Sequence, residues 1–454
     1  MTNNRGSFTG KLGYVLSAAG ASVGLGNIWR FPYLAAKYGG GIFLLVYILL
    51  ALTFGYTMII AETAIGRASG KSPVGAFRLF GRTPAAKFGG WLNAVIPVLI
   101  VPYYSVIGGW VCKYLFSYFF NGMDEIAEET FFSGFISNGR SVEIWFCVFV
   151  AMILVIVYMG VENGIERVSR FMMPILVVLA LVICAYVISR PGALSGVRFF
   201  LVPDFSRFSW MTVVSAMGQM FYSLSVAMGI LITFGSYMKK DVAIEKSTEQ
   251  VEIFDTAIAI LAGLMIIPAV FAFSGGDPET LKAGPSLMFI TMPKIFAGMG
   301  AGRLIAILFF ILVLFAALTS AIALTESAVS TFSDEFGWSR TAGTTFMAVI
   351  MAGLGTLSCL GYGPLSFITI IGMPFLDFFD FLTNSVMMPV AAVAICLLVV
   401  RHMGIQKLEE EVELEGHPFR RKVIFRFMIR YVCPVFAVVI LLSSVANAFG
   451  WIHM

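Results

Sequence analysis

Long apolar segments recur along the whole chain, and they limit the fold more than any other feature of the sequence. A helix that spans a bilayer needs about 20 mostly apolar residues, and short polar segments separate about eleven such runs. The predicted spans are 12–37, 42–65, 88–120, 142–158, 171–188, 211–237, 254–273, 303–332, 341–360, 368–400 and 423–448. Because 59% of the residues are hydrophobic and only 12% are charged, we predict an all-α integral membrane protein.

The charges of the connecting loops predict the orientation of the chain. Basic loop residues favour the cytoplasmic side; five Lys and Arg residues lie at 67–87, whereas four acidic residues lie at 124–129. We therefore expect a multi-pass protein of the prokaryotic plasma (inner) membrane, with its amino terminus in the cytoplasm and its carboxyl terminus outside. The net charge of +4 follows from this asymmetry and favours no nucleic-acid partner. The lipid bilayer is the expected environment.

Two spans contain residues that break helices at mid-membrane. The first carries Gly20, Gly24 and Gly26, and the sixth carries small and hydroxylic residues at 222–229. Close packing of small residues is one explanation. The two interrupted spans are five spans apart, and this spacing favours a second explanation. In it, an inverted 5+5 repeat places a binding site between two broken helices. We predict a first repeat at 1–190, a second at 191–400, and a cytoplasmic loop with an eleventh helix at 401–454.

Few ionisable residues lie inside the spans, and each is a functional candidate. Asp255 is expected to face a cation, or alternatively to lie at the cytoplasmic interface. The adjacent hydroxyls of Thr319 and Ser320 are suited to a hard cation, or to hydrogen bonds with their own helix. Snorkelling toward a membrane surface is the expected explanation for a last group, unless its members are paired. This group is Arg30, Glu62, Glu326, Asp377 and Asp380.

Four motifs, in order along the chain, resemble the neurotransmitter:sodium symporter family, which includes bacterial amino acid transporters. They are VGLGNIWRFPY at 23–33, AETAIGR at 61–67, QMFYSLS at 219–225 and LTSAIA at 318–323. The resemblance implies sodium-coupled symport of a neutral, hydrophobic or aromatic L-amino acid into the cell by alternating access. Because Gly24 replaces the aspartate of amine transporters, an amino acid with its own carboxylate is favoured over a monoamine.

The resemblance also implies two sodium sites. The first would be formed by Gly20, Val23, Ala316, Thr319 and Ser320. The second would be formed by Ser22, Asn27, Ser223 and Asp255, together with the substrate carboxylate. Since the charge of Asp255 can replace the chloride of animal relatives, we expect two sodium ions and no chloride.

The same resemblance places the substrate and the gates. The predicted substrate residues are Ser22, Gly24, Leu25, Gly26, Ile100, Tyr104, Tyr222, Ser225, Met228, Ser320 and Leu324. Tyr222 would cover the substrate, and Leu25, Gly26 and Tyr104 would hold its carboxylate. The predicted outer gate is Arg30 with Asp380, and the inner gate is Arg5 with Asp334. Gly164 and Pro174 are expected either to unwind the fifth span for sodium release or to form an ordinary kink.

Other classes of protein fit the sequence less well. A sodium-dependent sensor or channel with the same fold is the alternative, although the chain has no ring of repeated filter residues. An enzyme is not expected, because the sequence has no metal-ligating motif and no nucleophile elbow. The sequence leaves open which amino acid is preferred, the sodium stoichiometry, proton antiport and the oligomeric state.

Overall fold

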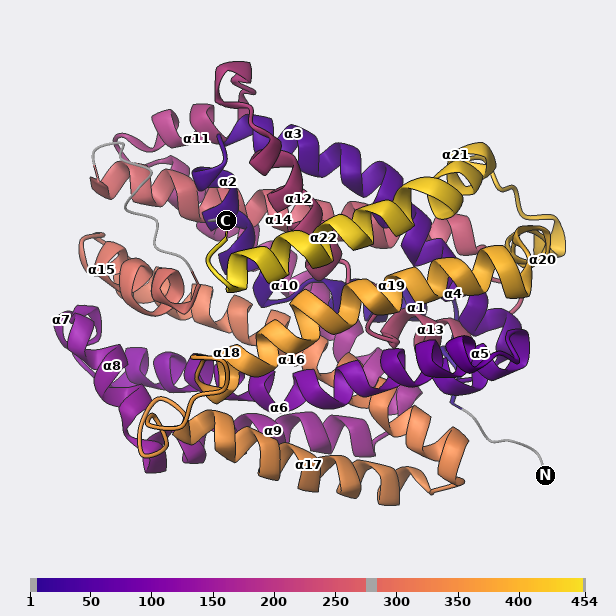
Figure 1. Ribbon diagram of the computed structural model, residues 1–454. Helices are drawn as coiled ribbons and strands as arrows, with labels where there is room; N and C mark the ends of the chain where they lie inside the picture. The colour runs from indigo at the N-terminus through magenta and orange to yellow at the C-terminus, as the bar shows by residue number, and fades with distance from the viewer. Residues whose placement is uncertain (1–5, 275–283, 452–454) are drawn as a thin grey trace.

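The computed structural model describes residues 6–274 and 284–451, and within them the chain is helical without strands. In this described part, nine continuous helices are long and apolar enough to cross a membrane. They are Gly41–Ser69, Pro84–Phe120, Gly139–Tyr158, Val161–Ile188, Ile244–Phe273, Gly302–Phe336, Arg340–Leu360, Phe375–Met403 and Lys422–Ala448. They run side by side as one bundle (Figure 1). The predicted all-α membrane fold is confirmed.

The first and sixth predicted spans are absent from these nine because both are interrupted. The first comprises α1 (Lys11–Ser22), a π-helical turn (Gly26–Arg30) and α2 (Phe31–Lys37). The sixth comprises α12 (Trp210–Ser223) and α13 (Ile230–Ser236). Between α12 and α13 the backbone is left-handed at Ser225, Ala227 and Gly229, with φ of 52°, 59° and 71°. Such backbone is tolerated in a membrane only where protein or water satisfies it.

The interrupted helices lie inside the bundle. α1 contacts α10 (Arg167–Ile188), α14 (Ile244–Ser274) and α16 (Gly302–Phe336). α16 packs along α6 (Pro84–Phe120), and α13 packs against α4 (Tyr56–Ser69). Continuous helices therefore surround both breaks and shield their free backbone groups from lipid.

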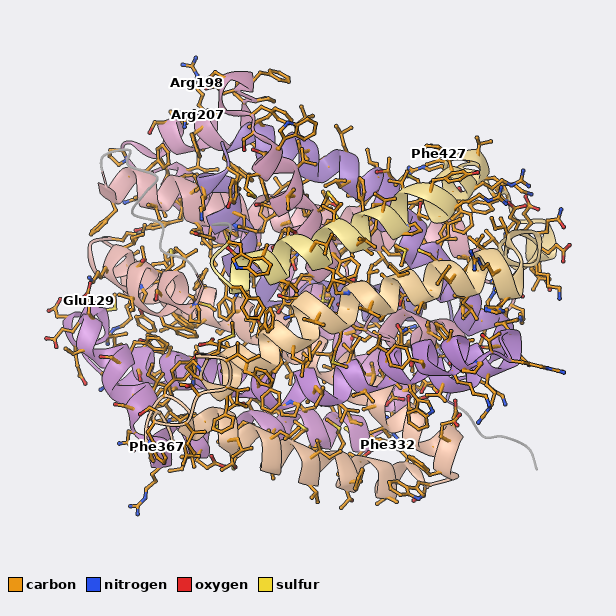
Figure 2. The ribbon with its side chains drawn as sticks, viewed as in Figure 1. Glu129, Arg198, Arg207, Phe332, Phe367 and Phe427 are labelled. Carbon is orange, nitrogen blue, oxygen red and sulfur yellow. The ribbon has the colours of Figure 1, made fainter. Side chains whose placement is uncertain are left out.

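The connecting segments differ between the two ends of the bundle. Figure 1 shows α5 (Pro73–Phe80) and α20 (Ile405–Val412) at one end of the bundle. The acidic α7 (Met123–Ala127) and α8 (Glu129–Ser137) lie at the other end. Apolar side chains of the outer helices are exposed, among them those of Phe427 (Figure 2), Val349 and Val438, as a lipid-facing surface requires.

Candidate functional site

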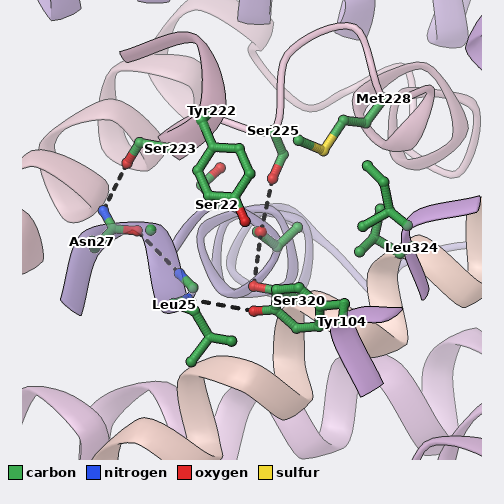
Figure 3. A pocket seen from close by; sticks show the side chains of 14 residues that line it. Ser22, Leu25, Asn27, Tyr104, Tyr222, Ser223, Ser225, Met228, Ser320 and Leu324 are labelled. Atoms are coloured by element: carbon green, nitrogen blue, oxygen red, sulfur yellow. Dashed lines mark hydrogen bonds between the residues drawn. The ribbon is translucent and has the colours of Figure 1, made fainter. Parts of the chain in front are cut away.

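The two helix breaks lie against each other near the centre of the bundle. Ser225 Oγ donates a hydrogen bond to the Ala21 carbonyl at 2.9 Å, and Asn27 Nδ2 donates to Ser223 Oγ at 2.8 Å (Figure 3). Gln219, to which the sequence analysis gave no role, donates from Nε2 to the Gly26 carbonyl at 3.0 Å. Side chains of one broken span thus satisfy the free backbone of the other.

Glu62 of α4 supports the second break. Its side chain is fully buried and accepts a hydrogen bond from the Ala227 amide at 2.7 Å. The snorkelling interpretation is therefore wrong for Glu62, because an amide freed by the break needs a buried acceptor. It is also wrong for Glu326, which is buried and forms an ion pair with Arg340 at 2.5 Å. The signal was present in the sequence, since a carboxylate within an apolar span requires a partner.

A small cavity of about 30 Å³ lies between the two breaks. Every residue predicted to surround the substrate lines it. Ala21, Asn27 and Ser223 complete its wall. Figure 3 shows these side chains converging from both interrupted spans and from α6 and α16.

One end of this cavity is polar. The Leu25 amide lies 3.4 Å from the Tyr104 hydroxyl, and both groups belong to the cavity wall. A Cβ atom on Gly24 would lie 2.8 Å from Ser320 Oγ and 3.1 Å from the Tyr104 hydroxyl. A side chain at position 24 would therefore fill the space beside the amide and the hydroxyl. Hydrogen-bond donors at a helix start favour an anionic group such as a carboxylate.

The opposite part of the cavity is apolar. Met228 and Leu324 lie on the side away from Leu25 and Asn27 (Figure 3), and Ile100 is a third apolar residue of the lining. Ser225 adds one hydroxyl. Met228 follows the left-handed Ala227 and lies at the end of the break. An unbranched methionine can repack around ligands of different shape, so this wall is suited to apolar side chains of more than one size.

An oxygen cluster joins α1 to α16 on one side of the cavity. Ser320 Oγ lies 3.3 Å from the Gly20 carbonyl, 3.1 Å from that of Ala21 and 3.2 Å from that of Val23. One hydroxyl can donate only one hydrogen bond, so the carbonyl oxygens outnumber the donor that they share. Such an excess of hard oxygen ligands fits a sodium ion. Thr319 lies beside Gly20, although its hydroxyl also donates to the Phe315 carbonyl at 2.9 Å.

A second cluster surrounds the carboxylate of Asp255. Asn27 Nδ2 donates to its Oδ1 at 2.8 Å, Ser223 Oγ approaches both oxygens at 3.2 and 3.1 Å, and the Tyr47 hydroxyl donates at 3.3 Å. Asp255 is fully buried, which disfavours the alternative location at the membrane surface. These hydrogen-bond partners are all neutral, and within the described part of the chain no basic side chain is paired with Asp255. A buried carboxylate in this setting favours a bound cation.

A wider cavity of about 460 Å³ begins on the other side of Tyr222. Tyr222 lines both cavities, and its ring covers the backbone at Gly26, where a Cβ atom would lie 2.6 Å away. Arg30 and Asp380 both line the wider cavity, and the Arg30 guanidinium lies 5.3 Å from the centre of the Tyr222 ring. The two charges face one space without a direct ion pair in the described structure.

The opposite side of the site is closed by packing. Phe8 packs edge-on against Phe234 and Tyr237, and its amide donates to the Tyr237 carbonyl at 3.1 Å. Asp334 accepts a hydrogen bond from the Ser72 amide at 2.7 Å. Its predicted gate partner, Arg5, lies outside the described residues.

The fifth span has an irregular start. A π-helical segment (Val161–Glu166) precedes α10, which contains Pro174. A Cβ atom on Gly164 would lie 2.2 Å from the Ile156 carbonyl oxygen, so the close approach of these turns requires glycine. The π-helical geometry shows that this end already departs from a regular α-helix.

A site between two interrupted helices at mid-membrane defines a solute transporter driven by ions. The family model described as the sodium:neurotransmitter symporter family matches residues 5–124 and 118–451. The chain is 33% identical over 443 residues to YhdH, an uncharacterized sodium-dependent transporter of Bacillus subtilis, with 96% of each chain covered. It is 31% identical to an uncharacterized sodium-dependent transporter of Haemophilus influenzae, covering 98% of this chain and 99% of the relative.

The architecture is also similar to a solved structure. The crystal structure of MhsT in complex with L-phenylalanine superposes with a TM-score of 0.86 at 36% identity, covering 97% of this chain and 100% of that one. The chain therefore belongs to the sodium:neurotransmitter symporter family, and the predicted resemblance is confirmed. It is a sodium-coupled membrane transporter and not an enzyme.

Proposed function

We propose that this transporter carries neutral L-amino acids with hydrophobic or aromatic side chains into the cell. The observation that carries the proposal is the division of the central cavity into one polar and one apolar part. The Leu25 amide and the Tyr104 hydroxyl would bind the substrate carboxylate, and carbonyl groups of the second break would bind its amine. Ile100, Met228 and Leu324 would contact the side chain. The L-phenylalanine bound to the similar MhsT supports this substrate class.

Two sodium ions would be coupled to the substrate. The first would bind carbonyls of Gly20, Val23 and Ala316 and the hydroxyls of Thr319 and Ser320, and so would link α1 to α16. The second would bind at Ser22, Asn27, Ser223 and Asp255. Each sodium supplies positive charge that its oxygen ligands stabilise, and the second also offsets the substrate carboxylate.

Transport would not require chloride. Two sodium ions and a zwitterionic substrate carry a net charge of two, and a fixed carboxylate at Asp255 offsets part of it inside a low-dielectric site. A bound chloride ion would add a second negative charge close to Asp255, which is unfavourable at that distance.

Alternating access would use the two sides that the structure distinguishes. Closure over the substrate would bring Arg30 toward Asp380 above Tyr222. Opening on the side of the amino terminus would release Phe8 and Asp334 from their contacts and lengthen the irregular start of the fifth span at Gly164. We expect this protein in the prokaryotic inner membrane, with the amino terminus inside.

The test is uptake of a panel of labelled neutral amino acids into proteoliposomes, with and without an inward sodium gradient. A parallel series replaces chloride with gluconate. The proposal expects sodium-driven accumulation of phenylalanine-like or leucine-like substrates that gluconate leaves unchanged. Folded protein that binds these amino acids without accumulating them would instead favour a sensor, and uptake that stops in gluconate would exclude the role given to Asp255.

A further inference from the structure

The segment 189–210, which joins α10 to α12, has an unusual surface. It contains α11 (Ala193–Leu201), a short turn (Phe205–Arg207) and the first residue of α12. Every residue from 201 to 210 is exposed. Phe205, in the short turn, is 72% exposed, and Trp210, the first residue of α12, is 81% exposed, so large aromatic side chains project from the loop and from the very start of the interrupted sixth span.

This segment lies at the side of the bundle, level with the ends of the spans. α11 packs against α14 and against the start of α3 (Gly41–Leu50), and Figure 1 shows it at the edge of the bundle. The neighbouring loop is held to the turn before α3 by a backbone bridge between Gly40 and Pro203. The exposed aromatic residues are not among those that line the wider cavity.

This location limits what can surround the segment. Irregular backbone exposed to lipid is not tolerated in the hydrocarbon region, and a contiguous aromatic surface is unfavourable in bulk water. Only the membrane–water interface suits both, because tryptophan accumulates at the depth of the headgroups and apolar rings beside it can reach the boundary of the acyl chains.

The charges of the segment favour a phosphate-bearing surface. It contains Arg190, Arg198 and Arg207 but only one acidic residue, Asp204. The side chains of Arg198 and Arg207 extend from this edge of the molecule (Figure 2). Arg207 pairs with Asp204 at 3.2 Å, with both side chains about half exposed, whereas the Arg198 side chain has no partner within the described residues.

We propose that residues 189–210 form an interfacial anchor that binds the headgroups of anionic phospholipids. Phe205, Phe208 and Trp210 lie at the boundary of the acyl chains, and Arg198 and Arg207 bind lipid phosphate. The acidic segment 124–129 at the same end of the bundle would repel the same lipids. Binding is therefore confined to one side of the protein.

The anchor would connect the membrane to the outer halves of both interrupted spans. A Cβ atom on Gly41 would lie 2.4 Å from the Val202 backbone, so the loop fits directly onto the turn that follows α2. The Thr212 hydroxyl of α12 lies 3.4 Å from the carbonyl of Tyr38. Lipid bound to the segment thus holds the end of α2 and the start of α12 together.

Two measurements test the anchor. The first compares retention of phosphatidylglycerol and phosphatidylcholine by the purified protein in native mass spectrometry, for wild type and the double variant Arg198→Ala/Arg207→Ala. Arg140→Ala/Arg303→Ala is the matched control, because it removes two exposed arginines elsewhere. We expect the preference for phosphatidylglycerol to fall about five-fold for each arginine of the segment, and to stay unchanged in the control.

The second measurement is quenching of tryptophan fluorescence by brominated lipid in proteoliposomes. Trp210→Phe should remove a strongly quenched component, because Trp210 lies at the acyl boundary. Equal lipid retention in all three proteins would overturn the headgroup site. An unchanged quenched fraction of the tryptophan fluorescence in Trp210→Phe would overturn the membrane anchor.

Discussion

The two oxygen clusters beside the central cavity differ in charge. The cluster between α1 and α16 consists of carbonyl and hydroxyl oxygens around Ser320, all of them neutral. The cluster around Asp255 contains a buried carboxylate with neutral hydrogen-bond donors. The comparison teaches that a cation at the first cluster would depend on the number and placement of oxygens, whereas a cation at the second would depend on a fixed charge.

The largest expected effect comes from removing that charge. Asp255→Asn keeps the shape of the side chain but would leave the proposed second sodium without its carboxylate. Since each ~1.4 kcal/mol changes an equilibrium ten-fold, and a buried charge interaction exceeds this several times over, we expect uptake in chloride-free buffer to fall by at least about 100-fold. Uptake of labelled substrate into proteoliposomes measures the change.

Chloride should partly restore this variant, because a mobile anion can replace the missing charge. The matched control is Asp377→Asn, which removes a carboxylate from the wider cavity and should leave chloride dependence unchanged. Equal impairment of Asp255→Asn with and without chloride would mean that the carboxylate has a structural role only.

Tyr104→Phe sharpens the comparison by removing a hydroxyl that faces the cavity and is not itself one of the proposed sodium ligands. The hydroxyl lies beside the Leu25 amide, and loss of a hydrogen bond to a charged group costs about 1.5–3 kcal/mol. We expect substrate affinity to fall about 10- to 100-fold in equilibrium binding assays. Sodium affinity of the substrate-free protein at the first site should not change, and a parallel loss there would contradict the separation of the two roles.

Thr319→Val tests the neutral cluster with a nearly isosteric side chain. Removal of one hydroxyl ligand should raise the sodium concentration for half-maximal binding by about ten-fold, the scale of one lost polar interaction. Thr325→Val is the control, because Thr325 is buried in the same helix and donates to the Ala321 carbonyl. If both variants shift sodium dependence equally, helix packing and not ion ligation is the cause.

The smallest effect is expected at the gate. Arg30→Ala removes the guanidinium over Tyr222 without touching either oxygen cluster. We expect a decrease of uptake of a few-fold, about the scale of an exposed or partly exposed ion pair, with both sodium affinities unchanged. Unchanged uptake kinetics in Arg30→Ala would count against the outer gate. Arg303→Ala is the control, because it removes an exposed arginine at the same end of the bundle.

The sequence was sufficient for features that depend on local composition. Apolar runs predicted the spans, and glycines and hydroxylic residues predicted the interruptions at 20–27 and 222–229. The resemblance then predicted that residues distant in sequence, such as Asn27 and Asp255, belong to one site. Asn27 Nδ2 lies 2.8 Å from Asp255 Oδ1. Their roles as sodium ligands stay predictions.

Other features required the fold. Glu62 is over 160 residues from Ala227 in the chain. The sequence around either residue does not show that the Glu62 carboxylate accepts a hydrogen bond from the Ala227 amide. The carbonyls of Gly20 and Val23 converge on Ser320 only because α1 breaks where α16 passes. Contacts of this kind depend on three-dimensional packing, which hydropathy and spacing do not define.

The most direct test of the charge comparison is equilibrium binding of labelled phenylalanine or leucine to the purified wild-type protein in three salts. These are sodium chloride, sodium gluconate and potassium chloride at equal ionic strength. The account predicts equal binding in both sodium salts and loss of binding in potassium. Binding that needs chloride as well as sodium would contradict it, because the carboxylate of Asp255 would then not supply the charge that the second site requires.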